Sequence, residues 1–380
     1  MRLGFNALFC VSLDKYFRMC YDKQNKCLEV TMRFFHTADV HLGAVPDTGF
    51  SWSEERAEEI WESFRGLIQQ IRQEKPELLL ISGDLFHRQP LKRELKEVNY
   101  LFSTIPDTTV VLIAGNHDYV KADSWYPRYP WADNVAGLWK PEPESLYIPG
   151  ADTWVYGFSY HQREIRDARY DVLAPNGKKG CHMLLAHGGD ESHIPIRKEK
   201  LAKSGFDYIA LGHIHRPQML LEHKAGYAGA LEPIDRNDMG PHGFIRGSFE
   251  NGRMNTEFVP WSVRSYESVT VAVHGDMSQY ELEERIEREV LGGGTRNIYR
   301  IRLQGFRDPQ MNFNLHRLKQ LGNIIDVEDD TLPDYDLEHL REQYEGSLIG
   351  DYIERFYECK HPVEKKALQY GLQALLASKR

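Results

Sequence analysis

The first part of the chain alternates short apolar runs with segments whose apolar residues recur every three or four positions. The short runs predict β-strands, and the periodic segments predict amphipathic helices. In chain order, the predicted elements are a strand that opens at Phe34–Phe35 and ends at Asp39, a helix behind a Ser51-x-x-Glu54 capping box that Pro76 ends, a strand at 78–81, a helix at 91–102 and a strand at 110–114. This alternation is typical of an α/β sheet with parallel strands.

Later segments add strands and then change in character. Further strands are predicted at 153–158, 182–186, 208–211 and 226–228, followed by a hairpin of 244–249 and 254–259 around Asn251-Gly252. We expect one large domain over 32–265, a small separate α/β domain over 266–330, and an acidic linker with C-terminal helices over 331–380. The run that we interpret as the linker is Asp326–Asp336, and Pro362 divides the two predicted tail helices.

Residues 1–31 stand apart from this pattern. They hold Cys10, Cys20 and Cys27 and none of the chemistry described below. Met32 lies immediately before the first strong strand. We therefore predict that Met32 is the true start and that residues 1–31 are an over-extended reading frame. The alternative is a genuine, weakly ordered arm.

Composition narrows the class of protein. The chain has 380 residues, of which 41% are hydrophobic and 27% charged, as in folded rather than disordered proteins. A formal net charge of -9 argues against a protein that binds polyanions by itself. It leaves open a nucleic-acid enzyme that binds its substrate through a local cationic surface or through a partner protein. No apolar run approaches the ~20 residues of a membrane span. The five cysteines form no CxxC pair, so we expect a cytoplasmic protein without disulfides or a zinc ribbon.

Five short polar segments follow predicted strands. They are Asp39-Val40-His41, Gly83-Asp84-Leu85-Phe86-His87, Gly115-Asn116-His117-Asp118, His187-Gly188 and Gly212-His213-Ile214-His215. Residues two apart on an extended segment point to the same side, so D-x-H and H-x-H can each chelate at one site. Each segment alone carries little weight, because a lone histidine at a strand end is more often structural. Their co-occurrence, each at a strand end, indicates a metal site.

The residue types indicate which ions this site would take. Carboxylate, imidazole and amide ligands without thiolate favour Mn²⁺, Fe²⁺ or Zn²⁺ over the all-oxygen cages of Mg²⁺ or Ca²⁺. Seven such ligands are too many for one ion. They suit two divalent ions bridged by a shared carboxylate.

In this order, the five segments resemble the motifs of the calcineurin-like metallophosphoesterases, over roughly Met32 to Phe258. Within that superfamily, segments 36–43, 83–87 and 211–218 resemble the SbcD-type DNA nucleases. His87 is the telling residue, because the phosphoprotein phosphatases generally lack a histidine there. The resemblance implies a four-layer α/β metallophosphoesterase sandwich, followed by a small α/β cap domain and C-terminal helices.

The resemblance also implies roles for individual residues. One metal would be held by Asp39, His41, Asp84 and His215, and the second by Asp84, Asn116, His187 and His213, with Asp84 bridging. His117 is the expected general acid or transition-state stabiliser. His87 would position the phosphate or His117, and Asp118 would orient His117. Mn²⁺ is the activator that the resemblance implies.

Three further features leave alternatives open. The aromatic and arginine residues at 125–131 could grip unpaired bases, or they could pack onto the sheet as a proline-rich insertion. The segment 230–237 could frame the site or contact a partner. The tail helices carry apolar stripes that could dock a partner or pack against the chain itself, namely Ile349, Ile353, Phe356 and Tyr357, and Leu368, Leu372, Leu375 and Leu376.

The leading hypothesis is a metal-dependent DNA exonuclease, with endonuclease activity left open, that acts at DNA ends within a repair complex. By resemblance, it would work with an SMC-like ABC ATPase and form a homodimer. One alternative is a calcineurin-like phosphatase or small-nucleotide phosphodiesterase, which the net charge mildly favours. A second alternative is an adaptor for DNA ends or the ATPase with weak activity, against which the complete ligand set argues.

Overall fold

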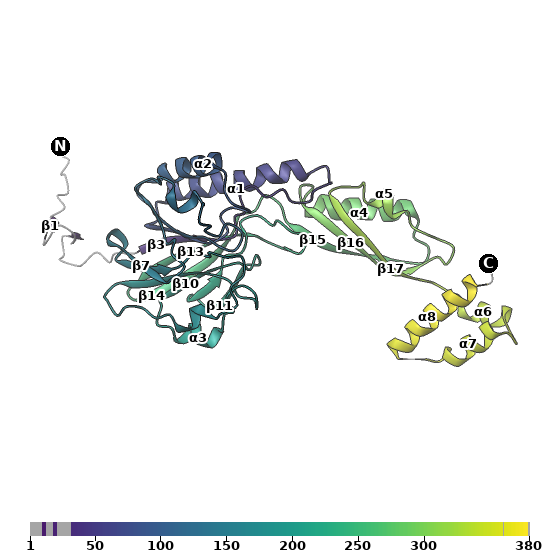
Figure 1. The fold of residues 1–380 in the computed structure, drawn as a ribbon. Helices are drawn as coiled ribbons and strands as arrows, with labels where there is room; N and C mark the ends of the chain where they lie inside the picture. Colours follow the sequence, from purple (N-terminus) through teal and green to yellow (C-terminus); the bar gives the residue numbers. More distant parts are fainter. Residues whose placement is uncertain (1–9, 13–17, 21–31, 360, 379–380) are drawn as a thin grey trace, which may run out of the picture. The chain divides into compact units, whose positions relative to one another are not determined.

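The structure is a computed structural model that describes residues 10–12, 18–20, 32–359 and 361–378 (Figure 1). The chain divides into two units, Met1–Ser265 and Tyr266–Arg380. Before residue 32, the description is limited to an antiparallel pair of short strands, β1 (Cys10–Ser12) and β2 (Arg18–Cys20). Our prediction for residues 1–31 otherwise lies outside the described residues.

The first unit contains two six-stranded sheets. In spatial order, the first sheet comprises β14 (Arg253–Pro260), β13 (Gly243–Glu250), β3 (Met32–Thr37), β4 (Leu78–Ser82), β5 (Thr109–Ile113) and β6 (Val135–Gly137). The second comprises β11 (Gln218–Leu221), β12 (Ala225–Tyr227), β10 (Tyr208–Gly212), β9 (Cys181–His187), β8 (Thr153–Gly157) and β7 (Glu144–Ile148). Strands β3 to β6 run parallel to one another, as do β8, β9, β10 and β12.

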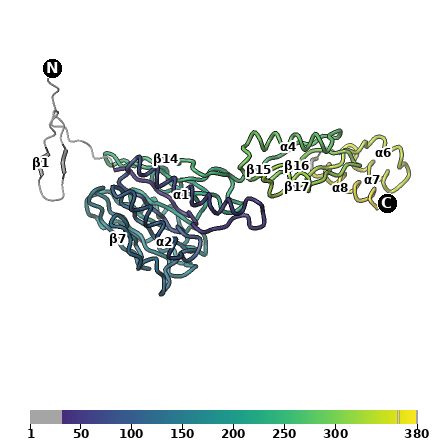
Figure 2. Tube along the Cα trace, turned by 90° about the horizontal axis from the view of Figure 1, so that it is seen from above, coloured from purple at the N-terminus to yellow at the C-terminus, as the bar shows by residue number. Residues whose placement is uncertain are grey.

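The two sheets stack face to face between helices. Alternate residues of β3 show the principle, since Phe34 joins the core between the sheets and Phe35 joins the core beneath the helices. That outer core packs against α1 (Ser53–Glu74) and α2 (Lys92–Ser103), which lie on one side of the sheets (Figures 1 and 2). Helix α3 (Lys198–Lys203) lies on the other side (Figure 1). Short 3₁₀ turns, η1 (Tyr126–Arg128), η2 (Pro149–Ala151) and η3 (Arg169–Val172), lie in the connections. This order of helix, sheet, sheet and helix confirms the predicted four-layer α/β sandwich.

Several boundaries differ from the prediction. The Ser51-x-x-Glu54 capping box does not form, because α1 begins at Ser53 with Trp52 as a cap residue whose side chain makes no capping bond. The Ser53 hydroxyl instead donates to the Pro46 carbonyl at 2.7 Å, which ties the helix start to the preceding loop. Three strands, β6, β7 and β11, were not predicted. They are edge strands whose residues are mostly part-exposed, so they lack the apolar runs that reveal buried strands.

The second unit opens with a three-stranded parallel sheet. Its elements are β15 (Tyr266–Val273), α4 (Gln279–Gly293), β16 (Ile298–Arg307), α5 (Leu315–Leu318) and β17 (Ile324–Pro333). Helix α4 buries Leu282, Ile286 and Val290 against the sheet, at the three- and four-residue spacing of one helix face.

Our prediction of an acidic linker at 326–336 is wrong for most of that run. Residues 324–333 form β17, with Ile324 and Val327 buried. Its carboxylates meet cations on neighbouring segments, since Arg302 pairs with both Glu328 and Asp330. Acidic composition therefore marks a charged edge strand here, because exposed charges keep sheet edges from pairing further.

Three helices, α6 (Leu337–Gln343), α7 (Leu348–Phe356) and α8 (Pro362–Ala377), end the described chain, where we predicted two. Pro362 is the first residue of α8, a position where its missing N–H costs little. The apolar stripes bury one another, with Ile353 and Leu372 fully inaccessible, so self-packing accounts for them. Among the described residues, no helix is long and apolar enough to cross a membrane.

Candidate metal centre

The loops after five strands meet in one cluster. Parallel strands bring their carboxyl ends to a common sheet edge. The neighbours β3, β4 and β5 do so in one sheet, and β9 and β10 do so in the other. The seven predicted metal ligands, Asp39, His41, Asp84, Asn116, His187, His213 and His215, all lie on these loops or strand ends.

Contacts within the cluster form two halves around Asp84. In one half, His41 Nε2 lies 3.1 Å from His215 Nε2 and 4.0 Å from the Asp84 carboxylate. In the other, His187 Nε2 lies 2.8 Å from Asn116 Oδ1 and 3.4 Å from the same carboxylate. His213 joins this second half, with Nδ1 3.1 Å from Asn116 Oδ1. Asp39 also lies near both halves, since its carboxylate is 3.9 Å from His187 Nδ1 and groups with His41 and His215.

Four of these residues have a strained backbone. Asp39, His41, Asp84 and His213 have φ values of 49°, 52°, 49° and 95°, in the region that non-glycine residues rarely adopt. Such residues cost on the order of 1–3 kcal/mol each and persist only where the surrounding structure holds them. Four cases in one cluster are typical of a functional site.

Three of the four imidazoles in the predicted ligand set, those of His187, His213 and His215, are held from behind. His187 Nδ1 donates to the Ser82 carbonyl at 2.9 Å, which leaves its Nε2 for the cluster. His215 Nδ1 lies 3.0 Å from the Asp238 carboxylate, and His213 Nε2 lies 2.7 Å from the Asp190 carboxylate. Such partners fix the ring orientation and the tautomer of a metal ligand.

The sequence prediction missed Asp190 and Asp238. Asp190 follows His187 by only three residues, and this closeness to a predicted ligand was a weak indication that Asp190 belongs to the site. Asp238 directly follows the 230–237 segment, whose role the sequence left open. Its carboxylate also accepts the backbone N–H groups of Ile234 and Asp235, at 3.0 and 3.1 Å. The segment therefore frames the site by presenting Asp238 to His215.

Burial and mutual charge shift the pKa values of the cluster. Burial raises the pKa of Asp39 to about 6, against the opposing charges of His187 and His215. Asp84 is equally buried, yet His187 lowers the pKa of Asp84 well below its usual range. Burial disfavours charged His187 and His215, but Asp84 raises the pKa of His187 to about 9, and Asp238 does the same for His215.

The donor set fits a bound divalent cation. His41 Nε2 faces His215 Nε2 at 3.1 Å, and His41 Nδ1 faces His87 Nδ1 at 3.3 Å. Burial lowers the pKa of His41 well below its ordinary value, so this ring has one proton for two histidine neighbours. At least one imidazole nitrogen around His41 therefore faces inward with a lone pair, beside the buried carboxylates of Asp39 and Asp84. A bound cation would satisfy both the lone pair and the carboxylates.

His87 and His117, here termed the histidine pair, lie on the more exposed side of the cluster. Their ring centroids are 5.1 Å apart, and both rings pack against His41. His117 Nδ1 donates to the His87 carbonyl at 3.0 Å, which leaves Nε2 available for another partner. The His117 backbone N–H donates to Asp84 at 2.9 Å, so the position of His117 is coupled to the cluster.

Asp118 has a different role from the predicted one. We expected its carboxylate to orient His117, whose ring is instead held by the His87 carbonyl. The Asp118 oxygens accept the backbone N–H groups of Gly115 and Phe86, at 2.8 and 3.2 Å. Asp118 therefore ties together the two loops that carry the histidine pair, because a short carboxylate satisfies nearby backbone donors first.

Two glycines allow the loops to approach this closely. A Cβ on Gly115 would lie 2.3 Å from Asp84 Oδ1 and 2.7 Å from His187 Nε2. A Cβ on Gly83, where φ is 91°, would lie 2.4 Å from His187 Nδ1. The space for the metal-facing atoms thus depends on both glycines.

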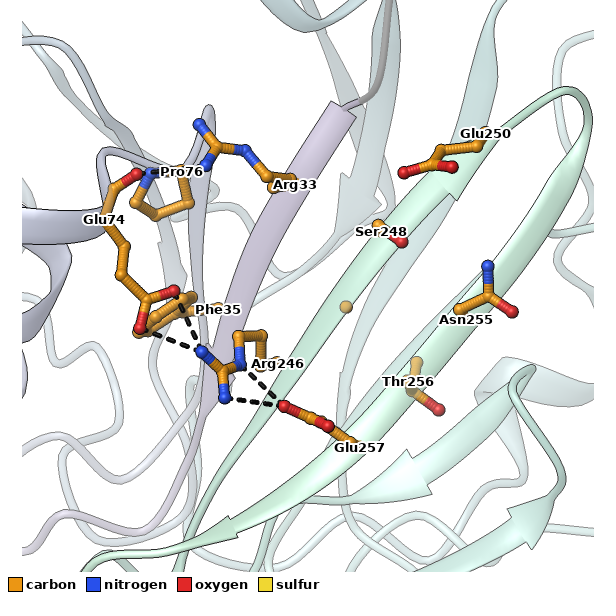
Figure 3. Close-up of a pocket in the computed structure, with 11 residues that line it drawn as sticks. Arg33, Phe35, Glu74, Pro76, Arg246, Ser248, Glu250, Asn255, Thr256 and Glu257 are labelled. Carbon is orange, nitrogen blue, oxygen red and sulfur yellow. Dashed lines mark hydrogen bonds and ion pairs between the residues drawn. The ribbon is translucent and has the colours of Figure 1, made fainter.

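A separate pocket of about 370 Å³ lies at the amino end of β3, away from Asp39 (Figure 3). Its central cation, Arg246, is already paired with Glu74 at 2.9 Å and Glu257 at 2.6 Å. These carboxylates neutralise the guanidinium, so the pocket offers little attraction for an anion. The chemistry of the molecule is therefore concentrated at the other end of the strand.

A double sheet with a His/Asp/Asn cluster at the strand ends is the arrangement that the sequence resemblance to the metallophosphoesterases implied. Residues 32–217 match the family model of the calcineurin-like phosphoesterases, so this part of the chain is a domain of the calcineurin-like metallophosphoesterase superfamily. Members use divalent metal ions, which agrees with the donor set described above.

The relatives that the chain matches include a metallophosphoesterase and DNA double-strand break repair proteins. The chain is 32% identical over 248 residues to the uncharacterized metallophosphoesterase YhaO of Bacillus subtilis, a match that covers 60% of each chain. It is 28% identical over 284 residues to the DNA double-strand break repair protein Mre11 of Methanocaldococcus jannaschii, covering 68% of this chain and 74% of that protein. Mre11 of Methanopyrus kandleri is 27% identical over 290 residues, covering 68% and 63%. The match to YhaO thus spans less than two thirds of its length.

Proposed function

We propose that this protein is a dinuclear-metal-dependent DNA nuclease that hydrolyses phosphodiester bonds at DNA ends. The observation that carries the proposal is the seven-residue cluster, five of whose members are buried, with the histidine pair beside it. A cluster alone fits any phosphoesterase. The similarity to proteins named for DNA double-strand break repair supports DNA as the substrate.

The proposed ligand sets follow the two halves of the cluster. Asp39, His41, Asp84 and His215 would hold one ion, and Asp84, Asn116, His187 and His213 would hold the other. Bound divalent ions, Mn²⁺ in this proposal, would polarise the phosphodiester and lower the pKa of a water molecule. The protein's part is to fix the ring nitrogens inward, through Asp238, Asp190 and the Ser82 carbonyl.

His117 would act on the leaving group. With its Nδ1 hydrogen engaged by the His87 carbonyl, the ring can carry a second proton only at Nε2. Protonation of a leaving oxygen by a positioned imidazole contributes typically 10²–10⁴-fold to the rate. His87, stacked beside His117 and packed on His41, would position that ring and the phosphate.

Partners belong to the same proposal. Because the chain is acidic, we propose that a partner in a complex supplies the affinity for DNA, and that this partner is an SMC-like ABC ATPase. A homodimer and a cytoplasmic location belong to the same proposal. The net charge of -9 supports a second candidate, a phosphatase or small-nucleotide phosphodiesterase, because such substrates need no extended cationic surface.

Substrate comparison separates these candidates. The full chain with Mn²⁺ would be given end-labelled duplex DNA, end-labelled single strands, a small phosphodiester and a phosphomonoester. The nuclease proposal predicts release of label from the DNA substrates. Rapid turnover of a small ester with intact DNA would overturn it in favour of the second candidate.

A further inference from the structure

The aromatic segment 125–131 contains three aromatic residues that pack onto the sheet and one exposed ring. Tyr126 is fully buried, and Tyr129 and Trp131 pack against the helix-side core. For these three, packing onto the sheet is the correct alternative. Trp125 differs, because it is 52% exposed. An indole left in solvent at a rigid position is a candidate contact surface.

Hydrogen bonds connect the loop of Trp125 to the chain segments that follow His87 and His117. The adjacent Ser124 hydroxyl donates to Gln89 Oε1 at 2.7 Å, and Gln89 Nε2 donates to the Tyr119 carbonyl at 2.7 Å. Gln89 lies two residues after His87, and Tyr119 lies two residues after His117. The loop that carries Trp125 is therefore hydrogen-bonded to the segment after His87, and through Gln89 to the segment after His117.

The loop beneath Trp125 is also firmly packed. The ring of Tyr126 lies 5.5 Å from Phe86 and 4.6 Å from Trp139, centroid to centroid. Phe86 immediately precedes His87, so this packing fixes the loop relative to the histidine pair. A pre-positioned ring loses little entropy when a ligand binds to it.

An unpaired cation lies over the indole, on a helix segment that carries two more. Lys92 Nζ lies 3.7 Å from the centroid of the Trp125 ring. The described contacts give Lys92, Arg93 and Lys96 no ion pair, because Glu94 is paired with Arg88 and Glu97 with Arg65. In a chain with a net charge of -9, this uncompensated positive charge beside the site is a local exception. It suits a phosphate backbone.

We propose that Trp125 and Lys92 form a binding site for an unpaired nucleotide of a DNA strand that enters the metal centre. A base stacks on the open face of the indole, and the Lys92 ammonium contacts a neighbouring phosphate. This inference rests on the proposed nuclease function and names where a frayed or single-stranded end is held.

The test is binding of a labelled single-stranded oligonucleotide to the full chain, followed by fluorescence anisotropy in the presence of a chelator, which prevents hydrolysis. Trp125→Ala should weaken binding about tenfold, and Trp125→Phe should restore most of it. Lys92→Gln should weaken binding and lower the salt dependence by about one phosphate contact.

Two matched controls should bind as the wild type does. Tyr280→Ala removes a ring that is 68% exposed on α4. Lys178→Gln removes a lysine that lies 4.3 Å over Trp154, in a similar pairing remote in sequence from the histidine pair.

Unchanged affinity in both Trp125→Ala and Lys92→Gln would overturn the inference while leaving the nuclease proposal intact. If the wild type binds no oligonucleotide, the inference is overturned, whereas the proposed function is decided separately by hydrolysis of end-labelled DNA. Equal weakening by the two controls would also overturn it, because the loss would then reflect surface aromatic or charge content alone.

Discussion

Replacing Gly115 with alanine should disable the metal centre without removing any ligand. The new Cβ would lie 2.3 Å from Asp84 Oδ1, whereas real Cβ contacts essentially never fall below 3.0 Å, so 3.0 − 2.3 = 0.7 Å of displacement is the minimum. Asp84 cannot yield freely, because it is 1% exposed and accepts the His117 N–H. His187, also in contact, is anchored by Ser82. Misplacement of ~1 Å in a catalytic constellation can cost about 10²-fold.

The assay measures two quantities on the same protein. Isothermal titration gives the affinity for Mn²⁺, and turnover of a small phosphodiester gives the rate, which should fall about 10²-fold. Gly150→Ala is the matched control, because a Cβ there meets nothing within 4 Å. Wild-type metal affinity and turnover in Gly115→Ala would refute the reasoning that these loops are packed to contact around the metal-facing atoms.

Three further outcomes follow from the contacts. Asp238→Asn should lower metal affinity 10–100-fold, because His215 loses the carboxylate that fixes its tautomer; unchanged affinity by titration would contradict this. Since the pKa values of His187 and His215 are raised to about 9, both rings are protonated at pH 7 and must deprotonate to bind metal. Metal binding should then release roughly two protons, and affinity should rise from pH 7 to 9, as calorimetry in buffers of different ionisation enthalpy would show. Arg56→Met should destabilise the fold by about 3–5 kcal/mol in urea unfolding, because Glu232 stays buried without its cation.

The local sequence pattern predicted the central strands of the sheets, and it also predicted that the metal ligands lie close together. Strands such as 78–81 are continuous apolar runs, and each site motif follows one directly. Because parallel strands share a direction, order along the chain was enough to group their loops. The sequence therefore predicted which residues cluster, although their assignment to metals stays a proposal.

Tertiary contacts decided what the local pattern could not. In the sequence, the acidic residues at 326–333 resemble a linker. In the structure they belong to a strand, because Arg302 pairs with Asp330 and Val327 is buried. Asp238 is one of many acidic residues in the sequence, and only the fold brings it to His215. Likewise, the exposure of Trp125 beside its buried neighbour Tyr126 follows from how one short loop sits on the sheet.

The central claim is that a two-metal centre with His117 beside it hydrolyses DNA. The most direct measurement combines metal content with degradation of end-labelled DNA, for the wild type and for His117→Ala, both as full chains loaded with Mn²⁺. We expect about two ions per chain in both proteins, and DNA hydrolysis that falls 10²–10⁴-fold in the variant. Wild-type hydrolysis by His117→Ala, or a wild type that binds two ions and leaves DNA intact, would contradict it.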